Sequence, residues 1–130
     1  MPFSRAIDDA FASAQPEPDF QPGWYQVRAT SACAITASTG TRGLRIGLVF
    51  VDGPYAGLIR HRDFWLGGRA VAFSKHQLET LGFGGLLPSE IECFTEFERL
   101  PPVAARLVRR EFNGRVSAEF DAIAAEVPVQ

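Results

Sequence analysis

Five strand-like stretches, separated by turns and by one helix-like stretch, are the feature that most constrains the fold. The clearest is the pair of alternating runs 103–112 and 115–123, joined by Asn113-Gly114. Both residues of a two-residue hairpin turn adopt positive φ, which Asn and Gly tolerate, so this pair predicts a hairpin. Three earlier runs, 24–38, 44–51 and 58–66, are separated by the turns STGTRG and DGPYAG and predict a three-stranded meander.

A helix is predicted between the third and fourth strands. The stretch 69–82 has apolar residues at helical spacing, with Gly82 as its C-terminal stop. A second short helix is predicted to begin with Ser89 as its N-cap and Glu92 as its capping-box partner, and to end before Pro101. A strand is the alternative for that second stretch.

This element order predicts the fold class. Three meandering strands, a helix and two further strands follow one another in the OB-fold, a five-stranded Greek-key barrel. We therefore expect an all-β protein with one or two short helices, folded as an OB-fold barrel with a helix between strands three and four. An SH3-like small barrel and a half-open sheet packed by helices are the alternatives.

The length of 130 residues predicts one domain. We expect residues 1–22 to be a lead-in segment with a short helix, residues 23–124 the OB-fold domain, and residues 125–130 a short C-terminal tail. No apolar run reaches the roughly 18 residues of a membrane helix, and the N-terminus lacks the apolar block of a secretion signal. A cytoplasmic setting without a membrane partner is the resulting expectation.

Sequence motifs of catalysis and metal binding are missing. The chain has no Gly-x-Ser-x-Gly, P-loop or His-Glu-x-x-His motif. Cys33 and Cys93 lack the spacing of a zinc site, and His61 and His76 are isolated from each other. We therefore expect no catalytic residue, no metal and no cofactor. A small nuclease or nucleotide-processing enzyme is the minor hypothesis.

Positive charge is concentrated in two regions although the net charge is −2. Residues 22–75 contain seven basic and two acidic residues, and residues 99–115 contain five arginines and one glutamate. The remaining acids lie mainly in the N-terminal segment and between residues 79 and 98. We expect the fold to gather the arginines around a shallow trough and to place the carboxylates on the other side.

The chain resembles a family of small phage and mobile-element proteins from replication and recombination modules, related to single-stranded DNA-binding OB-fold proteins. The segments that carry the resemblance are FQPGWYQVRAT, GLRIGLVFVDGPYAGLIRHRDFWL, SKHQLETLGF and FNGRVSAEF, between about residues 20 and 123. One departure is the first hairpin, where family members commonly have lysine and this chain has only Arg42. The resemblance implies an OB-fold and single-stranded DNA binding during replication or recombination.

Single-stranded DNA binding requires cations that follow the phosphates and exposed aromatic rings on which bases stack. Arg45 is expected to face outward from its strand because it lies opposite a continuous apolar set, and Arg28 lies opposite the apolar set of the first strand. Phe50, Phe64 and Trp65 are each either core or stacking residues. The predicted nucleic-acid-binding residues are Arg28, Arg42, Arg45, Tyr55, Arg60, Arg62, Trp65, Arg106 and Arg110.

The sequence thus favours a non-catalytic, sequence-tolerant protein that binds single-stranded DNA during replication or recombination of a phage or mobile element. The alternative is an OB-fold adaptor that binds a protein such as a helicase, primase or recombinase. Oligomeric state, including a homo-oligomer, is left open, as is the choice between DNA and RNA.

Overall fold

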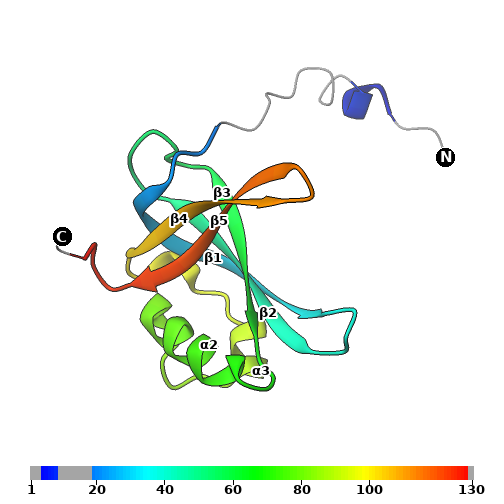
Figure 1. The fold of residues 1–130 in the computed structure, drawn as a ribbon. Helices are drawn as coiled ribbons and strands as arrows, with labels where there is room; N and C mark the ends of the chain where they lie inside the picture. Colours follow the sequence, from blue (N-terminus) through cyan, green and yellow to red (C-terminus); the bar gives the residue numbers. More distant parts are fainter. Residues whose placement is uncertain (1–3, 9–18, 129–130) are drawn as a thin grey trace.

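The computed structural model describes residues 4–8 and 19–128. Its main body is a strongly curled five-stranded antiparallel sheet, with short helices gathered at one end (Figure 1). The strands are β1 (Gly23–Thr36), β2 (Arg42–Phe50), β3 (Ile59–Trp65), β4 (Val103–Phe112) and β5 (Arg115–Ala124). The expected five strands are confirmed and the class is mostly β, with more short helical segments than the one or two expected.

Strand β1 is the centre of the sheet because it pairs with two neighbours. Its first part, Gly23 to Val27, pairs with β4, and the part from Val27 to Thr36 pairs with β2. The register shifts between Ala29 and Ser31, which is the geometry of a bulge, and bulges bend a strand. The resulting strand order is β3-β2-β1-β4-β5.

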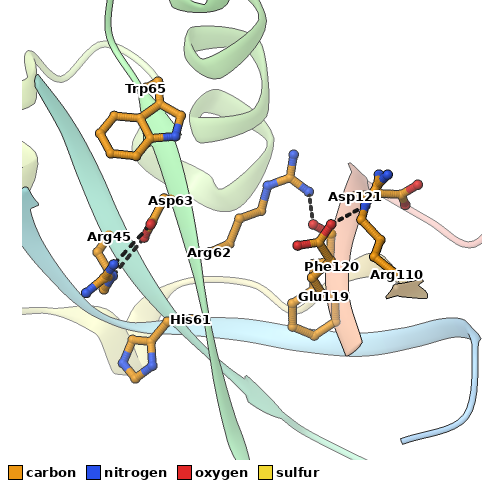
Figure 2. Close-up of a pocket in the computed structure, with 9 residues that line it drawn as sticks. All are labelled: Arg45, His61, Arg62, Asp63, Trp65, Arg110, Glu119, Phe120 and Asp121. Atoms are coloured by element: carbon orange, nitrogen blue, oxygen red, sulfur yellow. Dashed lines mark hydrogen bonds and ion pairs between the residues drawn. The ribbon is translucent and has the colours of Figure 1, made fainter. Parts of the chain in front are cut away.

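Strands β3 and β5 form the two edges, and among the described residues they are not paired through their backbones, so the sheet is not closed. Two arginine side chains of β3 bridge the gap instead. Arg62 Nη1 donates to the carbonyl oxygen of Phe120 at 2.6 Å (Figure 2). Arg60 Nη2 donates to the carbonyl oxygen of Ala118. We call this gap the β3–β5 seam.

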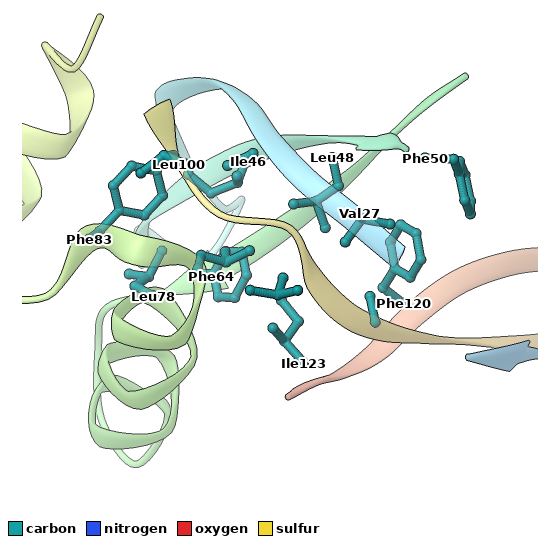
Figure 3. Close-up of a cluster of buried hydrophobic side chains, with 14 of the residues drawn as sticks. Val27, Ile46, Leu48, Phe50, Phe64, Leu78, Phe83, Leu100, Phe120 and Ile123 are labelled. Carbon is teal, nitrogen blue, oxygen red and sulfur yellow. The ribbon is translucent and has the colours of Figure 1, made fainter. Parts of the chain in front are cut away.

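Alternation along the strands separates an inner from an outer face. Val27, Ala29, Ile46 and Leu48 are fully buried on the inner face, and Leu107 joins them from β4. At one end of the sheet the aromatic rings of Phe20, Tyr25, Phe50, Tyr55 and Phe120 pack together. At the other end the core continues into side chains of the helical region, among them Leu78, Phe83 and Leu100 (Figure 3).

The helical region lies between β3 and β4, as predicted, and comprises α2 (Ala70–Leu78), η1 (Glu79–Phe83), α3 (Pro88–Glu92) and η2 (Phe97–Arg99). Gly82 has a φ of 115°, consistent with its predicted place at the end of the first helix. The prediction for the second helix was wrong at its start. Leu87 is the N-cap, and its N–H donates to the Glu90 carboxylate at 2.9 Å. Pro88, which lacks an N–H, takes the first helical position instead of Ser89.

The last hairpin follows its prediction closely. Asn113 and Gly114 have φ values of 52° and 78°, and both flanking strands begin and end within a residue of the expected bounds.

In the predicted lead-in segment, residues 5–8 are helical. The remainder of that predicted helix lies outside the described residues. The segment's end belongs to the domain, because Phe20 is a buried core residue.

Candidate nucleic-acid interface

Three consecutive cross-strand pairs form a row on the outer face of β2 and β3. Gly43 pairs with Trp65, Arg45 with Asp63, and Gly47 with His61. The row therefore consists of an aromatic ring opposite a glycine, an ion pair, and a second ring opposite a glycine. We call these six residues the ring–pair–ring row.

Gly43 allows the indole of Trp65 to lie against the backbone of β2, because a Cβ there would be 2.8 Å from Cε3 of Trp65 and 2.8 Å from the Phe64 carbonyl oxygen. At Gly47 a Cβ would clash with Oγ of Ser31 on β1 and would be in ordinary contact, at 3.5 Å, with Nε2 of His61, so this glycine is required by packing against β1. Both glycines are buried. Any larger residue at Gly43 would push the indole outward, so its place on the sheet surface depends on that missing side chain.

The ion pair at the centre of the row has bidentate geometry. Arg45 Nε donates to Asp63 Oδ1 at 2.8 Å and Nη2 donates to Oδ2 at 3.0 Å (Figure 2). The hydrogen bond and the charge of Asp63 raise the pKa of Arg45 above its usual value. The Arg45 side chain is 47% exposed and that of Asp63 29%, so both remain accessible to a ligand.

Helix α2 fixes the end of β3 that carries Trp65. The hydroxyl of Ser74, which is 4% exposed, donates to the Trp65 carbonyl oxygen at 2.8 Å. A buried hydrogen bond of this kind holds the backbone under the indole. Trp65 itself is half-buried, which leaves part of its ring open to solvent.

Arg60 and Arg62 do not belong to this face. They alternate with Trp65 along β3 and share the face of buried Phe64, whose ring lies 5.3 Å from the Arg62 guanidinium carbon. Their guanidinium groups span the β3–β5 seam, and burial lowers the pKa of Arg62. These two predicted contact residues thus have a structural role in the fold.

An open groove of about 730 Å³ runs along the seam beside the row (Figure 2). From β3 it is lined by His61, Asp63 and Trp65, and from the other edge by Glu119 and Asp121 of β5. Arg45, Arg62 and Arg110 also line it. The groove therefore mixes three arginines with three carboxylates and is not strongly positive.

Tyr55, predicted as a contact residue, is 8% exposed and packs in the aromatic end of the core. Its hydroxyl accepts a hydrogen bond from the Gln21 N–H at 2.8 Å and donates one to the Asp19 carbonyl oxygen at 3.2 Å. Its ring presents no open face on the outer side of the sheet. The turn between β2 and β3, which carries Tyr55, therefore anchors residues 19–21 to the domain.

The remaining predicted arginines are spread over the molecule. Arg106 forms a bidentate pair with Asp121, at 2.8 Å for both contacts, and Arg110 pairs with Glu119. Arg28 lies half-buried on the outer face of β1, and its Nε is buried without a hydrogen-bond partner. Arg42 is exposed at the start of β2.

The expected separation of charges was wrong. Carboxylates lie beside Arg45, Arg106 and Arg110, and Arg109 pairs with Asp19. Antiparallel pairing explains the difference, because it brings residues far apart in the sequence side by side. Asp63 is directly opposite Arg45, whereas Glu119 and Asp121 of β5 reach Arg110 and Arg106 of β4 from positions that are not directly opposite.

The sequence-based list of binding residues did not include His61, Gly43 and Gly47. The sequence did indicate His61, because alternation along the strand places it on the same face as Trp65. The glycines gave no such signal, since their role appears only when the register of β2 against β3 is known.

Among residues 4–8 and 19–128, no group of three or more His, Cys, Asp or Glu side chains is placed to hold a metal ion. In the same residues, no helix is long and apolar enough to span a bilayer. No protein-family model matches the chain, and a comparison with curated proteins finds no match either.

Proposed function

We propose that this chain is an OB-fold protein that binds single-stranded DNA without strong sequence preference, as in replication or recombination of a phage or mobile element. The observation that carries the proposal is the ring–pair–ring row, with Trp65 against Gly43 and His61 opposite Gly47 on the outer face of the sheet.

The strand arrangement supports the OB-fold interpretation. Strand β1 is bent and pairs with both β2 and β4, and helices between β3 and β4 cover one end. Strands β3 and β5, which the two seam arginines connect, are the edges that face each other when such a sheet curls into a Greek-key barrel. Backbone pairing is replaced there by side-chain hydrogen bonds.

Stacking supplies most of the attraction in this proposal. Each base stacked on an aromatic side chain contributes about 1–3 kcal/mol, and any base stacks because each has a π-face. Trp65 and His61 lie four residues apart on one strand, about 13 Å at the usual rise per residue. At this spacing the two rings stack on two different bases of the same DNA strand, and the Arg45 guanidinium lies between those bases.

The test measures DNA affinity and compares the two tryptophans of the chain, Trp65 in the row and Trp24 outside it. Fluorescence anisotropy with labelled oligo-dT should give a dissociation constant below about 10 μM at low salt. We expect Trp65→Ala to weaken binding roughly five- to 150-fold, the loss of one stacked base. The matched control, Trp24→Ala on β1, should bind like the wild type.

Intrinsic fluorescence adds an independent measurement. In a Trp24→Phe variant, Trp65 is the sole indole, and bound DNA should quench its emission. A dissociation constant above 10 μM, or equal affinity for the Trp65→Ala variant, would contradict the proposal.

The second candidate function is an OB-fold protein adaptor, and an apolar groove beside α2 and α3 favours it. The groove has a volume of about 330 Å³ and is lined mainly by apolar side chains, among them Leu66, Val71, Phe83 and Ile91. Leu87 at its rim is 65% exposed. Exposed apolar surface of this kind is typical of sites that bind other proteins.

A purified helicase, primase and recombinase from the same source would be titrated separately against the chain by biolayer interferometry. The adaptor function predicts that one of them binds and that Leu87→Asp abolishes its binding while leaving oligo-dT affinity unchanged. Lack of binding by all three, or binding that tolerates Leu87→Asp, would argue against it.

A further inference from the structure

We propose that the Arg45–Asp63 pair reads the Watson–Crick edge of an unpaired base held beside it. The inference rests on the proposed function, because it assigns a role to the centre of the same row. It explains how one surface selects single-stranded over paired DNA without selecting a sequence.

The pair leaves hydrogen-bonding capacity free on its exposed side. A guanidinium has five N–H donors and a carboxylate about four acceptor sites. Two donors of Arg45 and two acceptor sites of Asp63 are used in the bidentate contact. At Nη2 and Oδ2, which are 3.0 Å apart, a free donor and a free acceptor site therefore lie next to each other.

Every base carries the complementary pattern on its Watson–Crick edge. An acceptor and a donor are adjacent in adenine (N1 and the N6 amine), cytosine (N3 and the N4 amine), guanine (O6 and N1–H) and thymine (O4 and N3–H). Single-stranded recognition uses these edges, which are occupied in a duplex. An arginine–aspartate pair that offers one donor and one acceptor thus accepts all four bases and rejects a paired one.

The position of Asp63 supports this orientation of the ligand. Its carboxylate lies between two rings, two residues from each along β3. A phosphate placed over this point would be repelled by the carboxylate, whereas the N–H of a base edge is attracted to it. The sugar–phosphate backbone is therefore directed away from Asp63 and the base edges toward it.

The experiment compares oligo-dT of 12 nucleotides with the same oligonucleotide made of N3-methylthymidine. Methylation removes the N3–H donor but keeps the ring face, the sugar and every phosphate. For the wild-type chain, we expect methylation to weaken binding about two- to tenfold, the effect of one net hydrogen bond.

Two double variants identify the groups responsible. Arg45→Ala with Asp63→Ala removes the pair as a unit, leaves no unpaired charge, and should abolish the effect of methylation. The matched control is Arg106→Ala with Asp121→Ala, since that pair has the same bidentate geometry but lies on β4 and β5, and we do not include it in the proposed site. There the effect of methylation should persist.

Equal affinity of the wild-type chain for both oligonucleotides would overturn the inference and leave the proposed function intact. Persistence of the methylation effect without Arg45 and Asp63 would overturn it as well. Failure of the wild-type chain to bind either oligonucleotide would overturn both the inference and the proposed function. The wild-type comparison needs no variant, so the inference stays open to refutation even where a double variant is unstable.

Discussion

The salt dependence of DNA binding is expected to be shallow, because few unshielded cations lie on the proposed face. Among the described residues of β1, β2 and β3, the outer face presents the arginines Arg28 and Arg45, and Arg45 is paired with Asp63. For single strands, log affinity falls with log salt at a slope of about −0.7 per neutralised phosphate. One or two phosphates thus give a slope between about −0.7 and −1.4.

Raising NaCl from 50 to 200 mM should therefore weaken oligo-dT binding about three- to sevenfold. If all seven arginines of the sequence-based prediction contacted phosphates, the slope would be about −4.9 and the same change would cost roughly 900-fold. The two cases differ by more than a hundredfold, which anisotropy titrations at four salt concentrations resolve easily.

Single variants provide the internal control for the salt titration. Arg28→Gln should make the slope shallower by about 0.7, the contribution of one phosphate, and Arg106→Gln should leave it unchanged. A wild-type slope steeper than about −3 would refute the reasoning. It would mean that DNA recruits arginines which the structure pairs with carboxylates or places in the seam.

Three further predictions concern the parts that support this face. Arg62→Met removes the seam hydrogen bond and should lower the free energy of unfolding in urea by about 1–2 kcal/mol, with oligo-dT affinity unchanged. Gly43→Ala places a Cβ 2.8 Å from the Trp65 ring and should lower both the melting temperature and the affinity. Arg106 holds the pKa of Asp121 below its ordinary value of 3.8, so their pair stabilises the fold above that pH and loses its effect as the pH falls through the lowered pKa. Asp121→Asn should accordingly lower the urea midpoint at pH 7, and its difference from the wild type should shrink as the pH falls below 3.8.

The strands could be predicted from the sequence because their signals are local. Alternation in LRIGLVFV and the Asn113-Gly114 turn depend only on neighbouring residues, and β2, β4 and β5 begin and end within about two residues of their expected positions. The helix between β3 and β4 was likewise marked by its own spacing and by Gly82.

The orientation of β3 could not be predicted, because each face of this strand carries an aromatic residue. Phe64 and Trp65 are both adequate core residues, so alternation alone does not decide which face is inner. The structure buries Phe64, and this single choice moves Arg60 and Arg62 to the seam and leaves His61, Asp63 and Trp65 outside. The three residues that β3 contributes to the row are therefore on the outer face because of how β3 packs against β2 and β5, which the sequence pattern does not reveal.

The structural roles of the arginines change what their number in the sequence means. Arg60 and Arg62 connect two edge strands, and edge strands left with unsatisfied backbone groups promote unwanted pairing between chains. Arg106, Arg109 and Arg110 each have an acidic partner. A high arginine content is therefore needed by this fold whether or not it binds a polyanion, and it is weak support for DNA binding. The rings of Trp65 and His61 have no such structural requirement on the outer face, so the stacking experiment distinguishes the proposed function from a merely structural surface more sharply than charge reversal does.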